Sequence, residues 1–197
     1  MITSNIEITR VTSQSEIIDI RDLQALNLKQ NITYEEATVQ GFLTAEYTIN
    51  YLEEMNSVSP SIIAKDGEKV IGYSLVATKE IRKGHVLLEG LFDAIDECTY
   101  NGKLLRDVNY VVVGQLCVAK EYRGLGLVQQ LYGHFRDCLS NKFVYLVTDV
   151  AKANVRSLKA HKKRGFQVIN ELTYDDVGFD IVLWDWNATN QDFYKKS

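Results

Sequence analysis

Residues 110–139 constrain the fold of this chain more than any other stretch. Tyr110–Val118 is almost continuously apolar or β-branched, as expected for a buried strand. A polar turn follows at 119–123, and beyond it apolar residues recur at the three- and four-residue steps of a helix. The residues on that helical face are Leu127, Val128, Leu131, Phe135, Cys138 and Leu139. The stretch therefore predicts a strand, a loop and a helix whose apolar face packs on a sheet.

The loop enters this helix through Arg123-Gly124-Leu125-Gly126-Leu127-Val128. Glycine lets the main chain approach a ligand closely, and the first turn of a helix offers unpaired N–H groups at the positive end of its dipole. This combination suits a phosphate or pyrophosphate. A P-loop would need a following Gly-Lys-Ser/Thr, and a dinucleotide-binding turn would need a third glycine where Gln129 stands. Neither motif fits the segment well.

The segment resembles motif A of the GCN5-related N-acetyltransferase (GNAT) superfamily, Arg/Gln-x-x-Gly-x-Gly/Ala after a strand that ends in Leu-x-Val. The matching residues are Arg123 and Gly126, with Leu116 and Val118 before them. One difference is that Val128 replaces the last small residue of the motif.

A second part of the family pattern follows at the expected distance. After another apolar strand at 143–150, the chain is similar to Asn-x-x-Ala-x-x-Leu-Tyr-x-x-x-Gly-Phe. The residues that match in kind and spacing are Asn154, Ser157, Ala160, Gly165 and Phe166. His161 stands where many family members carry a tyrosine. Two spaced motifs joined by one strand are much more specific than either motif alone.

The resemblance implies an α/β (α+β) GNAT fold. Its central sheet is mixed and mostly antiparallel, with about seven strands, a splayed parallel pair of central strands and helices on both faces. We find no internal repeat, low-complexity tract or linker, so we expect a single domain over residues 1–197, of which 186–197 form a polar tail.

Hydrophobic periodicity predicts the remaining elements. A strand at 6–11 precedes a helix at 15–28, whose core side is Ile17, Ile18, Ile20, Leu23 and Leu26. A second helical stretch opens at Thr33, ends before Pro60 and carries Val39, Phe42, Leu43, Ile49, Tyr51, Leu52 and Met55. A hairpin turns at Asp66-Gly67, and two last strands within 167–186 are joined around 175–178. Residues 81–107 fit a strand extension, a helix or a long loop, and we expect an insertion near the active face.

The resemblance also implies the chemistry. Acetyl-coenzyme A (acetyl-CoA) would be the acyl donor, and the acceptor would be a primary amine of a small molecule or peptide that attacks the thioester directly in a ternary complex. The implied coenzyme-binding residues are Leu116, Cys117, Val118, Arg123, Gly124, Leu125, Gly126, Leu127, Val128, Asn154 and Ser157. The alternative is a non-catalytic acyl-CoA-binding module that uses the same fold to sense a metabolite or to mediate assembly.

Acetyl transfer to an amine requires an oxyanion donor, a proton donor for the leaving thiolate and a base for the amine. The backbone N–H of Val118 is the expected oxyanion donor, and His161 is the candidate that gives a proton to the leaving thiolate. The other interpretation of His161 is a surface position on a basic helix. Some related enzymes carry a glutamate on the central strand, but 111–118 contains no carboxylate. Asp149 is therefore the first candidate for the base, with Glu80 and Asp93 behind it.

Composition narrows the remaining classes. The net charge of −4 argues against general binding to nucleic acid or to a membrane surface. Three widely spaced cysteines without a CxxC pair are typical of a reducing compartment, which favours a cytoplasmic protein and leaves a nucleophilic-cysteine enzyme as a weaker alternative. The three histidines lack ligand-like spacing, so no metal is expected. A homodimer is one assembly compatible with the sequence.

Overall fold

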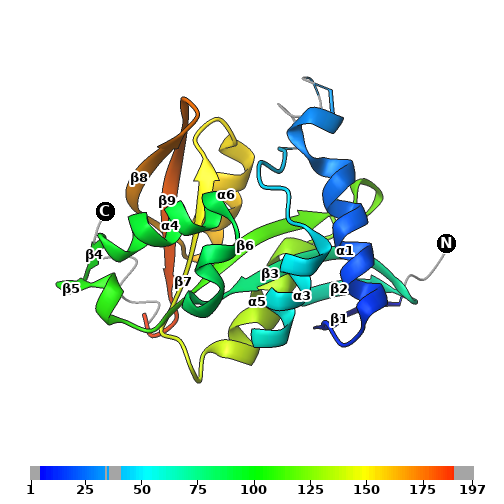
Figure 1. Cartoon of the computed structure of the whole chain (residues 1–197), viewed down its shortest axis with the longest axis horizontal. Coiled ribbons are helices and arrows are strands. Elements are labelled where there is room, and N and C mark those ends of the chain that lie inside the picture. Colours follow the sequence, from blue (N-terminus) through cyan, green and yellow to red (C-terminus); the bar gives the residue numbers. More distant parts are fainter. Residues whose placement is uncertain (1–4, 34, 36–40, 189–197) are drawn as a thin grey trace.

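The computed structural model describes residues 5–33, 35 and 41–188 (Figure 1). Within these ranges one sheet has the strand order β1-β2-β3-β6-β7-β9-β8, and its seven strands confirm the predicted fold class. The strands are β1 (Ile6–Arg10), β2 (Ile62–Asp66), β3 (Lys69–Ala77), β6 (Tyr110–Val118), β7 (Tyr145–Ala151), β8 (Gln167–Tyr174) and β9 (Val177–Asp185). A separate short hairpin consists of β4 (Thr99–Tyr100) and β5 (Lys103–Leu104).

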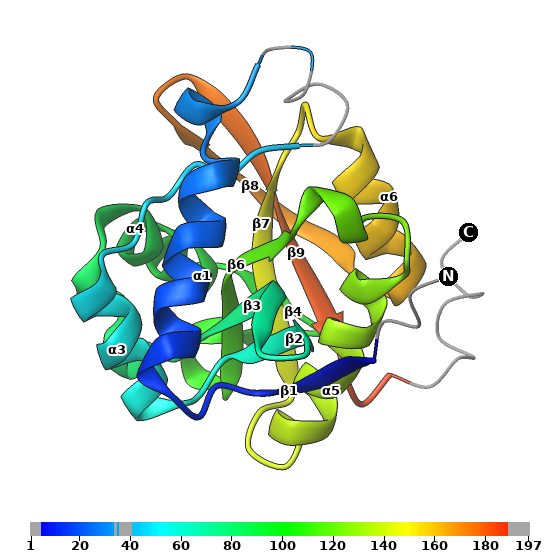
Figure 2. The ribbon, with the colours of Figure 1, turned by 90° about the vertical axis from the view of Figure 1, so that its right-hand side faces the viewer.

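The sheet is antiparallel except at its centre, where β6 and β7 run parallel. Helices cover both faces (Figure 2): α1 (Gln14–Asn27), α3 (Ile49–Val58) and α4 (Val86–Asp96) lie on one side, and α5 (Leu127–Leu139) and α6 (Val155–Arg164) on the other. The strands of the parallel pair are buried on both faces, as their continuous apolar sequences predict.

Local sequence signals explain where most elements begin. Ser13 caps α1 in a capping box, because its side chain accepts from the Glu16 N–H while the Glu16 carboxylate accepts from the Ser13 N–H. Ile17, Ile20 and Leu23 are buried, as predicted for the core side. The same prediction was wrong for two other residues, because Ile18 is 39% and Leu26 is 71% exposed.

The helical stretch predicted from Thr33 differs in the structure. Its residues 34 and 36–40, Val39 among them, lie outside the described residues. Phe42 and Leu43 are not helical, and α3 begins only at Ile49, after the N-cap Thr48. Residues 41–47 instead form an extended segment beside α1, in which the Leu43 N–H donates to the Asn27 carbonyl at 2.9 Å.

Residues 81–107, whose structure the sequence left open, are mainly helical. The short helix η2 (Lys79–Gly84) leads into α4, and the β4–β5 hairpin and η3 (Leu105–Asp107) return the chain to β6. The apolar patch of this region faces inward through Leu88, Leu91, Phe92 and Ile95 of α4. Among the helices of the described ranges, none is both long enough and apolar enough to cross a lipid bilayer.

Candidate active site

The parallel pair at the centre of the sheet opens into a V. The last paired residues are Val112 and Val147, and just beyond them the Thr148 hydroxyl donates to the Val113 carbonyl at 2.9 Å. Past this point β6 bulges: three steps from Val113 to Leu116 lie opposite only two steps of β3. An extra residue bends a strand away from its regular path. The bulge therefore turns the end of β6 away from β7 and creates the cleft.

Two main-chain N–H groups of β6 point into this cleft. The Ala119 N–H donates to the Ile71 carbonyl of β3 at 2.8 Å. Because N–H directions alternate along a strand, the N–H groups of Leu116 and Val118 point away from β3. The Val118 carbonyl accepts from Arg123 Nε at 3.1 Å, which fixes the end of the strand.

The Arg123 side chain has a structural task. Besides Val118, its guanidinium binds Asn27 Oδ1 at the end of α1, at 2.6 Å from Nη2. Any contact of this loop with a phosphate therefore falls mainly to its main chain. The backbone is shaped for that purpose, since Gly124 (φ 86°) and Gly126 (φ 76°) are both left-handed and Gly126 is the N-cap of α5. A Cβ at either glycine would have open space, so backbone conformation and not packing requires glycine here.

A pocket of about 380 Å³ follows this loop and the end of β6. All but one of the predicted coenzyme-binding residues line it: Leu116, Cys117, Val118, Arg123, Gly124, Gly126, Leu127, Val128, Asn154 and Ser157. The exception is Leu125, which is 55% exposed and is not among the residues that line this pocket. We call this the coenzyme pocket. The name refers to the ligand that the sequence analysis predicts. These residues lie together because they belong to two motifs that the parallel strands place side by side.

The second motif forms the opposite wall through α6. Asn154 caps this helix by accepting from the Ser157 N–H at 3.1 Å, and Gly165 ends it in a left-handed conformation. Of the basic residues around α6, Arg156 lines the coenzyme pocket. Others have different roles: Lys152 pairs with Glu171 at 2.5 Å, and the Arg164 guanidinium lies over the Trp184 ring. Neither Lys152 nor Arg164 is among the residues that line the coenzyme pocket.

A second pocket of about 180 Å³ lies between the diverging ends of β6 and β7. We call it the acceptor pocket. Its wall includes part of α4, the 41–47 segment, β7 and the β8–β9 hairpin. Of the described residues, six line both pockets: Phe42, Leu43, Leu116, Asn154, Ser157 and His161. The two pockets therefore meet at the mouth of the V.

Asp149 of β7 lines the acceptor pocket and is the only acidic residue among its described lining residues. The residue as a whole is half-buried, and burial of its carboxyl raises the pKa from 3.8 to about 6, against a smaller opposing effect of its own backbone N–H. A carboxyl with this pKa is ionised at neutral pH and can still accept a proton readily.

His161 is buried, with 8% of its surface exposed, and lines both pockets. Its Nδ1 lies 2.8 Å from the Ser157 carbonyl, which can only accept, so Nδ1 carries the hydrogen. Its Nε2, 2.7 Å from the Tyr132 hydroxyl, then accepts from that group. Burial lowers the pKa of the imidazole, which favours the neutral ring. In that state its single N–H points at Ser157 and not into the cleft.

The sequence analysis did not identify Tyr132, which lines the acceptor pocket from α5. A tyrosine on the buried side of the motif helix was the available signal, because a buried phenol needs a hydrogen-bond partner. Gln115, Tyr47 and Tyr174 were also missed. Their partners come from distant segments, which periodicity does not reveal.

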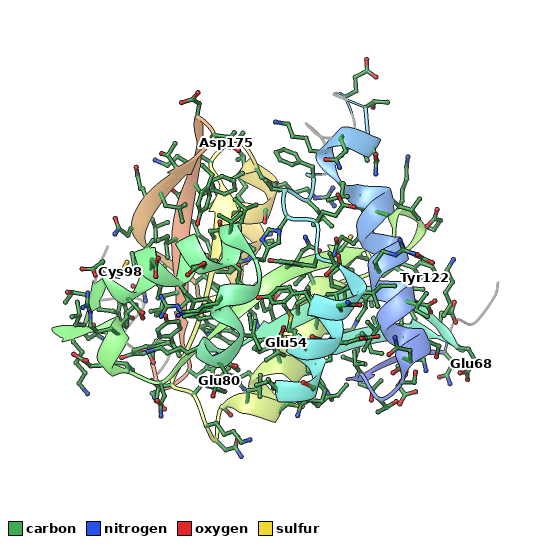
Figure 3. All side chains as sticks on the ribbon, viewed as in Figure 1. Glu54, Glu68, Glu80, Cys98, Tyr122 and Asp175 are labelled. Carbon is green, nitrogen blue, oxygen red and sulfur yellow. The ribbon has the colours of Figure 1, made fainter. Side chains whose placement is uncertain are left out.

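The other candidates lie elsewhere. Glu80 and Asp93 are not among the residues that line either pocket, and Asp93 pairs with Arg82. Figure 3 shows Glu80 far from Asp175, which marks the tip of the β8–β9 hairpin. Burial raises the pKa of the Cys117 thiol to about 12, which disfavours a nucleophilic thiolate. Within the described ranges, no three His, Cys, Asp or Glu side chains gather as a metal site would require.

Comparison with known families identifies the class of protein to which this fold belongs. The model of the "Acetyltransferase (GNAT) family" matches residues 27–166, which is more than half of the chain. The chain belongs to this acetyltransferase family, as its motifs predicted. No curated protein matches the sequence at a significant level.

Solved structures share the fold at low identity. The NatC complex bound to Gag peptide and CoA aligns at 14% identity and a TM-score of 0.64, covering 92% of this chain and 99% of that one. The putative acetyltransferase yncA from Salmonella typhimurium, solved with acetyl-CoA, aligns at 12% and 0.61, covering 94% and 96%. Naa50 from Arabidopsis thaliana, in complex with the bisubstrate analogue CoA-Ac-MVNAL, aligns at 15% and 0.59, covering 92% and 99%.

Proposed function

We propose that this chain is an N-acetyltransferase that moves the acetyl group of acetyl-CoA to a primary amine by direct attack in a ternary complex. The observation that carries the proposal is the meeting of the coenzyme and acceptor pockets at the V between β6 and β7. An amine on one side can reach a thioester held on the other. Family membership supports acetyl transfer, and the structures of yncA, NatC and Naa50 contain acetyl-CoA, CoA or a CoA conjugate.

The coenzyme would bind mainly through the main chain. The first turn of α5 and the left-handed glycines Gly124 and Gly126 present N–H groups to the diphosphate, and Arg156 adds a cation to the same pocket. The pantetheine arm would pair with Leu116–Val118 as an added strand, because β7 has already diverged there. Asn154 and Ser157 border the arm from α6.

In the transfer, the amine nitrogen attacks the thioester carbon, a C–N bond forms and the C–S bond breaks. The Val118 N–H, aimed into the cleft, would stabilise the oxyanion of the tetrahedral intermediate. The Asp149 carboxylate accepts the proton that the amine loses, directly or through water. The leaving thiolate takes up one proton, so the products are an amide and free CoA thiol.

We propose His161 as the residue that interacts with the leaving sulfur, in line with its position in the shared wall of the two pockets. To protonate the sulfur, Nε2 must carry a hydrogen, whereas in the neutral ring Nδ1 carries it. The hydrogen bond between Tyr132 and His161 therefore has to rearrange in that step. This requirement links Tyr132 to any catalytic role of His161.

The second candidate is an acyl-CoA-binding module without catalysis. The orientation of the His161 N–H and the absence of a carboxylate on β6 favour it. Asp149 in the acceptor pocket favours catalysis, since coenzyme binding alone gives no reason to bury a carboxyl there.

Thiol release separates the two candidates. The protein is incubated with acetyl-CoA and a mixture of primary amines, free CoA thiol is measured, and products are identified by mass spectrometry. Calorimetric titration with acetyl-CoA alone reports binding. An acetyltransferase gives amine-dependent thiol release and an acetylated product. Tight binding of acetyl-CoA without amine-dependent release would contradict the proposal and favour the binding module.

A further inference from the structure

The acceptor pocket has one charged group in a wall that combines apolar and aromatic side chains with uncharged polar ones. Asp149 is the only acidic or basic side chain, apart from the neutral His161, among its described lining residues. Around it are Leu87, Leu88 and Leu91 of α4, together with the rings of Phe42, Tyr47, Tyr174 and Phe179. The Tyr174 and Phe179 rings meet edge to face at 5.9 Å. Such a wall suits one ammonium group attached to an apolar body.

The two tyrosines lie near the carboxylate. Burial raises the pKa of the Tyr174 phenol to about 12, and the charge of Asp149 is the next contribution. Burial also raises the pKa of Tyr47, to which Tyr51 and then Asp149 contribute. Both phenols therefore stay protonated, and both rings line the same pocket as Asp149.

Four main-chain carbonyls of this wall are already paired with side chains of the protein. The Tyr47 hydroxyl donates to the Gly114 carbonyl at 3.0 Å, and the Tyr174 hydroxyl to that of Leu87 at 3.0 Å. The Ala45 carbonyl accepts from Gln115 Nε2 at 2.7 Å, as the Val113 carbonyl does from Thr148. A peptide acceptor needs partners for its own amide groups. These carbonyls are used by the protein instead.

Tyr174 also joins two walls of the pocket. Its ring, at the end of β8, lies against Gly90 of α4, where an added Cβ would come within 2.7 Å of the hydroxyl. Together with the bond to Leu87, this contact docks the β8–β9 hairpin onto α4. The resulting space of about 180 Å³ is slightly larger than a cavity of roughly 150 Å³ that accommodates benzene.

We infer that the acceptor is a small monoamine with an apolar body, held by Asp149 and the surrounding rings, and not a polyamine or a polypeptide N-terminus. A polyamine would need further carboxylates for its other charges, and the described lining residues supply one. The inference rests on the proposed function and narrows its substrate.

The first test compares acceptors at a fixed saturating concentration of acetyl-CoA. The panel contains isopentylamine, 2-phenylethylamine, spermidine and a pentapeptide with a free N-terminus, and kcat/KM is measured from thiol release. We expect both monoamines to exceed spermidine and the pentapeptide by about tenfold or more. A higher kcat/KM for spermidine or the pentapeptide would overturn the inference and leave the proposed transfer intact.

A matched pair of variants tests the location of the acceptor. Leu87→Phe adds volume to a lining residue, whereas Val86→Phe adds it at the neighbouring residue of α4, which is 77% exposed. Leu87→Phe should raise the KM for isopentylamine by about tenfold and leave the KM for acetyl-CoA within about twofold. Val86→Phe should change neither. Equal effects of the two variants, or a change in the acetyl-CoA KM alone, would contradict the assignment.

Failure of the proposed function gives a different result from failure of this inference. If no amine releases thiol, calorimetry with the CoA-saturated protein still measures amine binding. Binding of the monoamines in preference to spermidine would support the pocket assignment without catalysis. No binding of either monoamine would overturn it.

Discussion

Replacing Asp149 by asparagine tests the charge in the acceptor pocket through two independent readouts. The first is activity. With a pKa of about 6, the carboxyl is about 90% ionised at pH 7 and about 10% ionised at pH 5. If the ionised form accepts the proton of the amine, kcat/KM of the wild type falls by about tenfold between these pH values. The Asp149→Asn variant should have low activity without this inflection near pH 6.

The second readout is the free energy of unfolding. The pKa of Asp149 rises from 3.8 to about 6 on folding, because burial penalises the charged form. The folded wild type therefore loses stability as the pH rises from about 4 through 6, and stays at the lower value above that range. Two pKa units correspond to at most about 3 kcal/mol, and partial exposure of the residue reduces this figure. Asp149→Asn removes this pH-dependent loss.

Urea unfolding of both proteins at several pH values between 4 and 8 measures the difference. Asp149→Asn should gain stability relative to the wild type as the pH rises, while packing differences contribute equally at every pH. Asp107→Asn, at an exposed carboxyl outside both pockets, serves as the control and should show no such trend. A constant difference between the Asp149→Asn variant and the wild type across this range would refute the raised pKa. Unchanged activity of that variant at pH 7 would refute the role as base.

Three further changes test other parts of the site and fold. Gly126→Ala places a Cβ at a residue with φ 76°, so it should lower the free energy of unfolding by about 1 kcal/mol. It should also raise the KM for acetyl-CoA. An unchanged KM would contradict the proposal that this loop binds the diphosphate of the coenzyme. If His161 protonates the sulfur, His161→Ala should lower kcat more than it changes KM, and His161→Tyr should recover part of the lost kcat. Tyr132→Phe should alter the pH profile of kcat, because Tyr132 is hydrogen-bonded to His161. An unchanged kcat in both His161 variants would contradict this role. Ser13→Ala removes the N-cap of α1 and should lower the free energy of unfolding, measured by urea titration, by about 1 kcal/mol. The KM for acetyl-CoA should not change. The control Ser57→Ala, at an exposed helix position, should have little effect on the free energy of unfolding.

Local chemistry was sufficient to predict much of the fold. The helix predicted at 15–28, the turn at Asp66-Gly67 and the strand-loop-helix of 110–139 each depend on neighbouring residues. The errors arose where distant contacts decide the outcome. Leu26 comes three residues after Leu23 but lies off the buried face of α1 and is exposed, although Leu28 beyond it is buried. The 41–47 segment has apolar residues at helical spacing, yet bonds to Asn27, Gln24 and Gln115 hold it extended.

The coenzyme pocket and the acceptor pocket differ in how far the sequence predicts them. A phosphate-binding loop uses main-chain N–H groups, so its requirement appears directly as glycines and a helix start at fixed spacing. The acceptor pocket uses side chains from α4, β7, the 41–47 segment and the β8–β9 hairpin, which are brought together only by the topology. The hydrogen bond between Tyr174 and Leu87 joins residues 87 positions apart, and no local sequence pattern predicts it. Changes in α4 or the hairpin can therefore alter which acceptor binds while the coenzyme loop stays the same. Substitutions of Leu87 or Tyr174 should accordingly change the ratio of kcat/KM between two amines far more than they change the KM for acetyl-CoA.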